Sequence, residues 1–443
     1  MTRRQSESRA ALASIVLGFL LLTSAVVVSA WGSNPDPAAH SGPNPRVAPS
    51  PGAGAESGGA VPAAASMGVD AAPPAGPVPN ASVGFGPDWA TYDGGNGFVY
   101  VTDYSNVSVI NGTSVIANVT AGWEPNSAVW DPENGYVYVP NEDSNNVSVI
   151  SGTAVVGSVT VGNVPNDVVY DSGNGDVYVT DYESSNISVI HGTQLVGSVT
   201  VGKSPASAVY DSGDGDVYVL NSFSDTVSVV NGTTVVATVP VGSGPENAVY
   251  DGGNGYVYVP NSDSGNVSVI RGTSMVGTVP VGLYPSGAVY DGRSGLVYVP
   301  NSGSNNVSVI QQTRVETSVV VPSSPDGGLY DDGNGEVYVI EAFSGNVSVI
   351  NGTSVVAAIP VGSGPENAAY DSGNGYVYVP NYGSNNVSII GALPSPGGTP
   401  SPSGPGAAVW LYAVNGVLVG AIVAGVVLYV MRRRRRPPDA SSF

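Results

Sequence analysis

The sequence contains no cysteine, and its 443 residues include only two histidines, His40 and His191. Without cysteine there are no disulfide bonds, no thiolate metal sites and no cysteine nucleophile. Two isolated histidines are too few for a histidine-rich copper or haem centre, and they argue against a Ser-His-Asp triad. We therefore expect no catalytic residues, no metal ligands and no enzyme activity. A lactonase-like or glycan hydrolase site built from loop carboxylates is the alternative.

Basic residues are also scarce, with 13 Lys and Arg against 34 Asp and Glu. Eight of the 13 lie near the ends of the chain, at Arg3, Arg4, Arg9 and Arg432 to Arg436. Residues 31 to 406 hold five basic and 32 acidic residues, a local net charge of −27. So acidic a surface repels nucleic acid, and we expect no nucleic-acid partner.

Two apolar runs predict how the chain meets the membrane. The first, Ala10 to Ala30, follows a basic N-terminus, so residues 1–30 are a signal peptide or an uncleaved signal anchor. The second, residues 407–431, has no charged residue and is long enough for a transmembrane helix. Arginines directly after it place the tail, residues 432–443, in the cytoplasm. The protein is thus expected to be a single-pass cell-membrane protein whose central region is extracytoplasmic.

Low-complexity segments separate these runs from the centre of the chain. Residues 31–77 are rich in Pro, Ala, Gly and Ser, and residues 392–406 are rich in Pro, Gly and Ser. Neither segment can bury enough apolar surface to fold alone, so we interpret them as a linker and a stalk. The folded part is expected at residues 78–391.

A repeat of about 40 residues fills that central region. The tyrosine of a Val-Tyr-Val triplet recurs eight times, spaced by 38 residues once and then by 40: Tyr100, Tyr138, Tyr178, Tyr218, Tyr258, Tyr298, Tyr338 and Tyr378. Each copy holds four short runs of strand-forming residues bounded by Gly, Asn and Asp, which we name strands A to D. Four-stranded antiparallel meanders repeated in this way predict an all-β fold, a β-propeller with one blade per copy.

Prolines and small residues predict the order of the strands within a blade. Pro240, Pro280 and Pro360 lie in strand D, which must therefore be the outer edge strand, because proline has no N–H to donate. Strand A carries Ala or Gly in most copies and is expected to lie innermost. Only seven D strands follow their C strands, and we expect residues 78–84 to supply the eighth. Eight blades are predicted, and seven blades with a surplus half-blade are the alternative.

The repeat resembles the YVTN-type β-propeller repeat, named for a Tyr-Val-Thr-Asn tetrapeptide. Tyr100-Val-Thr-Asp103 differs from it at the last position and Tyr138-Val-Pro-Asn141 at the third, and the Val-Ser-Val-Ile and Val-Gly-x-x-Pro elements match it well. The resemblance covers about residues 78–391. It implies a secreted or surface-exposed protein and brings no shared catalytic residues.

An aspartate recurs at the end of strand A in every copy: Asp93, Asp131, Asp171, Asp211, Asp251, Asp291, Asp331 and Asp371. At the head of a Gly- and Asn-rich turn, we interpret it as a turn residue that bonds its own backbone. The loop from Asp171 to Asp176 is similar to a calcium loop but lacks a closing bidentate glutamate. Structural Ca²⁺ is therefore the alternative to an expected absence of cofactors.

Asn-x-Ser/Thr sequons are frequent, which predicts glycosylation in an extracytoplasmic region if the host has the machinery. The candidates are Asn80, Asn106, Asn111, Asn118, Asn146, Asn186, Asn231, Asn266, Asn306, Asn346, Asn351 and Asn386.

Comparison of the repeats with one another suggests a recognition surface. The A–B and C–D turns barely change between copies, whereas the B–C and D–A loops, which share the opposite face, diverge in aromatic and acidic residues. The candidate binding residues are Tyr104, Trp123, Glu124, Glu142, Asp143, Tyr182, Glu183, Phe223, Asp225, Asp263, Tyr284, Phe343 and Tyr382. We expect a binding, adhesion or envelope-structure module with an extracellular protein or glycan as its ligand. Relaxed drift of loops without a packing role explains the divergence equally well.

Overall fold

The computed structural model describes residues 77–391. The expected signal segment, almost all of the N-terminal linker, the stalk, the transmembrane helix and the cytoplasmic tail lie outside the described residues. Within 77–391, no helix is long and apolar enough to cross a membrane.

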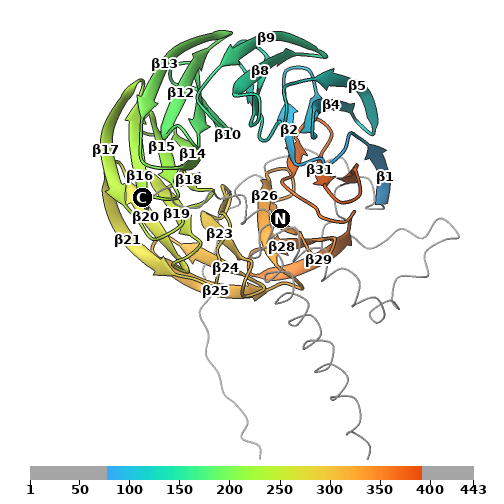
Figure 1. Ribbon diagram of the computed structural model, residues 1–443. Coiled ribbons are helices and arrows are strands. Elements are labelled where there is room, and N and C mark those ends of the chain that lie inside the picture. The colour runs from blue at the N-terminus through green and yellow to red at the C-terminus, as the bar shows by residue number, and fades with distance from the viewer. Residues whose placement is uncertain (1–76, 392–443) are drawn as a thin grey trace, which may run out of the picture. The chain divides into compact units, whose positions relative to one another are not determined.

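The described residues form eight four-stranded antiparallel sheets arranged in a ring, which confirms the predicted eight-bladed β-propeller (Figure 1). Blade 1 contains β2 to β5, and the blades follow in chain order to blade 7, which contains β26 to β29. The A strands are β2 (Trp89–Asp93), β6 (Val129–Asp131), β10 (Pro165–Asp171), β14 (Pro205–Asp211), β18 (Val249–Asp251), β22 (Val289–Asp291), β26 (Pro325–Asp331) and β30 (Ala369–Asp371). The B strands are β3 (Phe98–Thr102), β7 (Tyr136–Asn141), β11 (Asp176–Asp181), β15 (Asp216–Asn221), β19 (Tyr256–Asn261), β23 (Leu296–Asn301), β27 (Glu336–Glu341) and β31 (Tyr376–Asn381).

The C strands are β4 (Asn106–Asn111), β8 (Asn146–Ser151), β12 (Asn186–His191), β16 (Thr226–Asn231), β20 (Asn266–Arg271), β24 (Asn306–Gln311), β28 (Asn346–Asn351) and β32 (Asn386–Ile390). The D strands are β5 (Ser114–Thr120), β9 (Ala154–Thr160), β13 (Gln194–Thr200), β17 (Thr234–Pro240), β21 (Ser274–Pro280), β25 (Arg314–Val320), β29 (Ser354–Pro360) and β1 (Pro77–Ser82).

The ring closes through its first strand. β1 pairs antiparallel with β32, with Pro77 opposite Ile390 and Ser82 opposite Asn386. Blade 8 therefore has the order β1-β32-β31-β30, and the two ends of the folded region meet in one sheet. The predicted eighth D strand is confirmed, and the seven-blade alternative is wrong.

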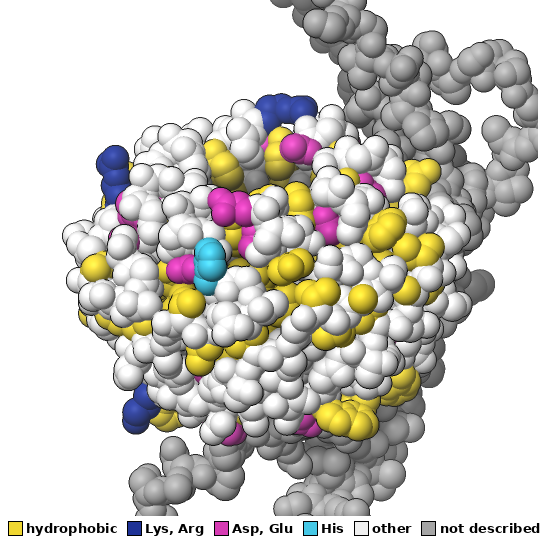
Figure 2. Space-filling model, turned by 90° about the horizontal axis from the view of Figure 1, so that it is seen from above, with side chains coloured by type: hydrophobic (Ala, Val, Ile, Leu, Met, Phe, Trp, Pro, Cys, Tyr) yellow, Lys and Arg dark blue, Asp and Glu magenta, His cyan; other side chains and the backbone are white. Residues whose placement is uncertain are grey.

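Strand D is the outer edge of each blade, as the prolines predicted. Pro240, Pro280 and Pro360 are exposed at the rim, where a missing N–H leaves no ladder bond unmade. Figure 2 shows apolar side chains in a band across the outer side of the molecule. At the inner edge, A strands of neighbouring blades approach closely, and the Ala288 N–H donates to the Asn247 carbonyl across that boundary at 3.1 Å.

Strand A differs from the prediction in half of the blades. The expected strand from Asn247 to Tyr250 is in fact β18, only three residues long, and β6, β22 and β30 are equally short. These are the four blades in which strand B carries a proline, at Pro140, Pro260, Pro300 and Pro380. Such a proline has no N–H to give to strand A, so regular pairing stops before it. The proline carbonyl can still accept a hydrogen bond. In blade 2, for example, the Pro140 carbonyl accepts the Asn126 N–H at 3.0 Å.

The core lies between the blades and is built from the central residues of strands B and C. All eight tyrosines of the Val-Tyr-Val triplets are at most 1% exposed. Several of their hydroxyls donate to a carbonyl in the C–D turn of the next blade, as Tyr100 does to Gly152 at 2.9 Å. Tyr378 donates to Gly112 at 2.9 Å and thereby joins blade 8 to blade 1.

The repeated aspartates are turn residues, as predicted. In every blade one carboxylate oxygen accepts the backbone N–H two residues further on, at distances of 2.7 to 2.9 Å. In most blades a tyrosine of the following blade also reaches this aspartate. Burial, then the hydrogen bond and charge of Asp211, raise the pKa of Tyr250 to about 12.

Candidate functional site

All 13 candidate binding residues lie on one face of the ring, which we call the upper face. It carries the B–C and D–A loops, whereas the A–B and C–D turns form the lower face. Trp123, Glu124 and Tyr284 belong to D–A loops, and the other ten belong to B–C loops.

Hydrogen bonds join the upper-face loops into a continuous network. Within one blade, the D–A and B–C loops share backbone bonds, for example from the Tyr182 N–H to the Val164 carbonyl at 2.9 Å. Between blades, the Asn145 Oδ1 atom accepts the Val164 N–H at 2.8 Å. Val164 has a φ of 56°, a left-handed conformation that β-branched residues rarely adopt. The network thus holds strained loops in a fixed geometry, as a recognition surface requires.

Asp225 takes part in this network. Its Oδ1 atom accepts the Gly244 N–H at 3.2 Å, as Asn385 does from Gly86 at 2.9 Å in another blade. Of the predicted residues, Asp225 is therefore one that links loops of adjacent blades.

Three exposed aromatic side chains form a continuous row, which we call the aromatic strip. Phe85, Tyr104 and Trp123 are 66%, 46% and 61% exposed. Phe85 and Tyr104 meet edge to face with ring centroids 6.4 Å apart, and Tyr104 and Trp123 do so at 6.2 Å. Our sequence reasoning missed Phe85, although it follows Gly84 as Trp123 follows Gly122, at the same place in the repeat.

The remaining aromatic candidates lie apart from the strip or at its edge. Phe223 is 60% exposed, and the Lys203 ammonium lies over its ring at 5.7 Å from the centroid. Tyr284 and Phe343 are also exposed. Tyr382 is half-buried, and a side chain at Gly86 would meet its ring at 3.0 Å.

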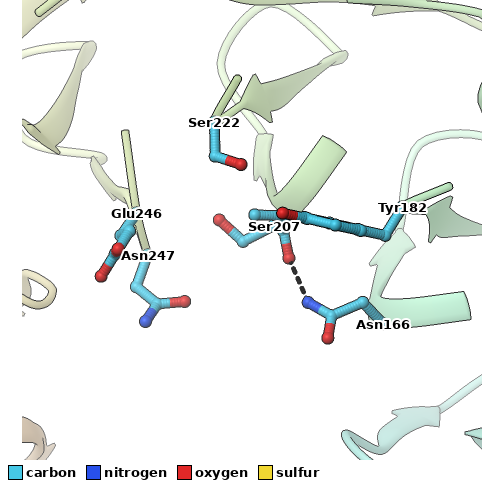
Figure 3. Close-up of a pocket in the computed structure, with 7 residues that line it drawn as sticks. Asn166, Tyr182, Ser207, Ser222, Glu246 and Asn247 are labelled. Atoms are coloured by element: carbon cyan, nitrogen blue, oxygen red, sulfur yellow. Dashed lines mark hydrogen bonds between the residues drawn. The ribbon is translucent and has the colours of Figure 1, made fainter. Parts of the chain in front are cut away.

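A polar pocket opens on the same face beside the inner strands of blades 3 to 5 (Figure 3). Its volume is about 190 Å³, and it is lined by Asn166, Tyr182, Ala206, Ser207, Ser222, Glu246 and Asn247. Tyr182 is the one predicted residue that reaches it. The others were missed, although the residues after the leading proline of strand A also differ between copies, which could have revealed them.

The pocket side chains are held by bonds to their neighbours. Asn166 Nδ2 donates to the Ala206 carbonyl at 2.6 Å, as Figure 3 shows, and Asn247 Nδ2 donates to the Ser286 carbonyl at 3.1 Å. The Ser262 hydroxyl donates to Glu246 Oε1 at 3.1 Å. Ser207 is only 4% exposed, and its hydroxyl has no hydrogen-bond partner within the described residues.

Among the described residues, the lining of the pocket holds one carboxylate rather than a pair of the glycosidase kind. Glu246 is the carboxylate among the lining residues, whereas such a mechanism requires two that flank the substrate. Asp167 lies nearby on β10, where its Oδ2 atom accepts the Ala208 N–H at 3.0 Å. Burial raises the pKa of Asp167 to about 6.

No three His, Cys, Asp or Glu side chains come together to hold a metal ion within residues 77–391. His191 lies in a C–D turn of the lower face, with its Nδ1 atom 3.0 Å from Asp176 Oδ1.

The sequon asparagines fall into two groups. Asn80, Asn111, Asn118, Asn231 and Asn351 are exposed. The seven at the start of C strands are half-buried: Asn106, Asn146, Asn186, Asn266, Asn306, Asn346 and Asn386. The serine of each of these seven sequons is buried.

Fold and site together define the protein as a β-propeller, and comparison with known proteins agrees. No family model and no curated protein matches the chain. Among solved structures it is similar to hydrazine synthase from Kuenenia stuttgartiensis, with a TM-score of 0.51 and 17% identity over 70% of this chain and 96% of that one. Virginiamycin B lyase from Staphylococcus aureus has a TM-score of 0.52 and 12% identity, covering 61% of this chain and 95% of its own. A streptogramin B lyase has a TM-score of 0.50 and 14% identity, covering 60% and 93%. At these identities the similarity shows the fold alone.

Proposed function

We propose that this chain is a YVTN-type β-propeller that is anchored at the cell surface and binds an extracellular protein or glycan through its upper face. The observation that supports this most strongly is the aromatic strip, three exposed rings on loops that also carry acidic residues and are fixed by backbone hydrogen bonds. Exposed aromatic side chains on a rigid scaffold are the usual anchors of a binding surface. Binding of this kind needs no catalytic residue, cofactor or metal.

The way the ring closes supports an outward orientation of the upper face. Strand β32 ends at Ile390 beside Pro77, on the side of the C–D turns. Both ends of the folded region therefore leave from the lower face. A stalk over residues 392–406 and a membrane helix over 407–431 would attach there, which would direct the aromatic strip away from the membrane.

Glycosylation is proposed for the exposed group of sequons. Asn111, Asn231 and Asn351 lie at C–D turns of the lower face, and the threonine of each sequon is exposed too. Glycans at these sites would leave the upper face uncovered. Intact-mass and glycopeptide analysis of the natively purified protein would test this, and an unmodified mass would overturn it.

The binding proposal can be tested with the full chain purified in a non-ionic detergent and applied to glycan and protein-ligand arrays. We expect ligands that the wild type retains and that a Phe85→Ala, Tyr104→Ala, Trp123→Ala triple variant loses. A lower-face variant, His191→Ala with Gln194→Ala, is the matched control and should bind as the wild type does. Equal binding by all three proteins, or none by any of them, would contradict the proposal.

A further inference from the structure

Acidic residues belong to the same hydrogen-bonded loops as the aromatic strip. The Asp143 N–H donates to the Trp123 carbonyl at 3.2 Å, and the Glu124 N–H donates to the Tyr104 carbonyl at 3.1 Å. The Glu142 N–H in turn donates to the Glu124 carbonyl at 2.8 Å. Backbone bonds thus tie three acidic residues to the loops of the strip, and Asp143 among them is exposed.

Blade 4 shows how a cation sits on an aromatic ring in these same loops. Lys203 occupies the D–A position that Trp123 occupies in blade 2, and Phe223 occupies the B–C position of Asp143. In blade 4 the chain supplies both cation and ring, with the ammonium 5.7 Å from the ring centroid. In blade 2, by contrast, the aromatic ring of Trp123 is in the D–A loop, and the carboxylate of Asp143 is at the B–C position.

Among the described residues, the blades that carry the strip contain no basic side chain. Residues 77–162, which include all of blades 1 and 2, contain no Lys or Arg, and neither do residues 365–391 of blade 8. A ring face attracts a cation through its quadrupole, and an adjacent carboxylate strengthens that attraction. A neutral sugar could also stack on the rings and donate hydroxyl hydrogen bonds to a carboxylate, but it would gain no charge attraction, so the two ligand classes differ in their response to charge.

We propose that the aromatic strip, together with the exposed carboxylate of Asp143, docks arginine or lysine side chains of a partner protein. This inference rests on the proposed binding function and specifies the chemistry of the partner. A guanidinium stacked over Trp123 would place its N–H donors within reach of the neighbouring carboxylate, an arrangement for which arginine is better suited than lysine.

Surface plasmon resonance with immobilised ten-residue peptides tests this. One peptide alternates arginine with glycine, a second replaces arginine with uncharged citrulline, and maltohexaose serves as a neutral sugar probe. The analytes are the full chain in non-ionic detergent and its Trp123→Ala, Asp143→Asn and Leu283→Ala variants. Leu283 is the matched control, because it occupies the position of Trp123 in blade 6 and is equally exposed, at 61%.

We expect the arginine peptide to bind and the citrulline peptide to bind at least about tenfold more weakly, with a further loss of about tenfold on Trp123→Ala. Asp143→Asn should weaken binding about threefold and reduce its salt dependence, and Leu283→Ala should leave it within about twofold of wild type. Thermal melting would verify that each variant is folded.

Two results would overturn the inference. Equal arginine-peptide binding by wild type and Trp123→Ala would mean diffuse attraction to an acidic surface. Binding of maltohexaose that depends on Trp123, without a preference for arginine over citrulline, would mean that the strip recognises carbohydrate. If the strip recognises carbohydrate, the proposed binding function would still stand. If the array ligands bind the triple variant as well as they bind the wild type, the binding function itself would be wrong.

Discussion

At the scale of single residues, polar side chains fix each blade to the next. Tyrosine hydroxyls of strand B reach carbonyls in the neighbouring C–D turn, and strand A tyrosines reach turn aspartates such as Asp211. Blade 2 is the exception, because Trp130 replaces the tyrosine and its buried Nε1 has no partner within the described residues. The tyrosines and aspartates that recur in nearly every copy of the repeat are thus residues that join neighbouring blades.

The contribution of one such hydroxyl can be measured with Tyr298→Phe. The substitution removes the 2.9 Å bond from the Tyr298 hydroxyl to the Gly352 carbonyl and leaves that acceptor without its donor. We expect the free energy of unfolding to fall by about 1–2 kcal/mol in urea denaturation. Tyr376→Phe, half-buried on strand B of blade 8, is the control and should change it by less than about 0.5 kcal/mol. Equal effects would show that the inter-blade bond contributes nothing.

Asp181 makes the stability of blade 3 depend on pH. Burial raises the pKa of this carboxyl to about 7, although Ser188 and Asn186 donate hydrogen bonds to it. The unfolded chain titrates near pH 4, so the folded state holds the extra proton between about pH 4 and pH 7. Stability is therefore greatest below the unfolded pKa and falls as the pH rises through that range.

Asp181→Asn should remove this dependence, because Asn141 and Asn261 occupy the same buried place in other blades. We expect the variant to be more stable than wild type by on the order of 2 kcal/mol at pH 8. At pH 4 the difference should be small. Thermal melts from pH 4 to 8 would show it as diverging curves, and parallel curves would mean that Asp181 does not titrate in this range.

At the scale of strands, most of the fold could be predicted from the sequence. Gly, Asn and Asp at turns marked the strand ends, and Pro240 and Pro280 identified the outer edge, because both signals are local. The short A strands were not predicted, since the effect of Pro140 falls on β6, the strand that would have bonded to it. The pocket was missed for a similar reason: Asn166, Ser207 and Glu246 come from three blades, and only their packing around the axis brings them together.

Closure by β1 is the element on which the ring depends, and Ala81 tests it. This residue is 5% exposed and lies opposite Val387, the place that Val119 takes opposite Val107 in blade 1. Ala81→Asp would bury an unpaired carboxylate, and we expect it to lower the free energy of unfolding by about 3 kcal/mol or more. Ala81→Val, which copies blade 1, should be tolerated. Wild-type stability of Ala81→Asp would mean that β1 does not close the ring.

At the scale of the whole molecule, the ring places the ends of the described region and the candidate binding residues on opposite faces. Both ends of the described region lie at the lower face, while the aromatic strip and the polar pocket lie on the upper face. Divergence between repeats predicted that these loops share one face, because residues common to all blades serve packing. That this face binds a ligand stays a prediction. Both proposals, membrane attachment and ligand binding, require the upper face to point outward on the cell surface. That orientation can be measured directly.

Because the sequence contains no cysteine, a variant with one introduced cysteine can be labelled by a thiol-reactive dye at that position alone. Glu183→Cys on the upper face and Gln194→Cys on the lower face lie in the same blade, and both wild-type side chains are exposed. Each variant is treated on intact cells with a membrane-impermeant fluorescent maleimide, and energy transfer to an acceptor dye in the membrane is measured. We expect that both variants react and that the dye at residue 194 transfers more efficiently than the dye at residue 183. Labelling only after lysis, or the reverse order of transfer, would contradict it.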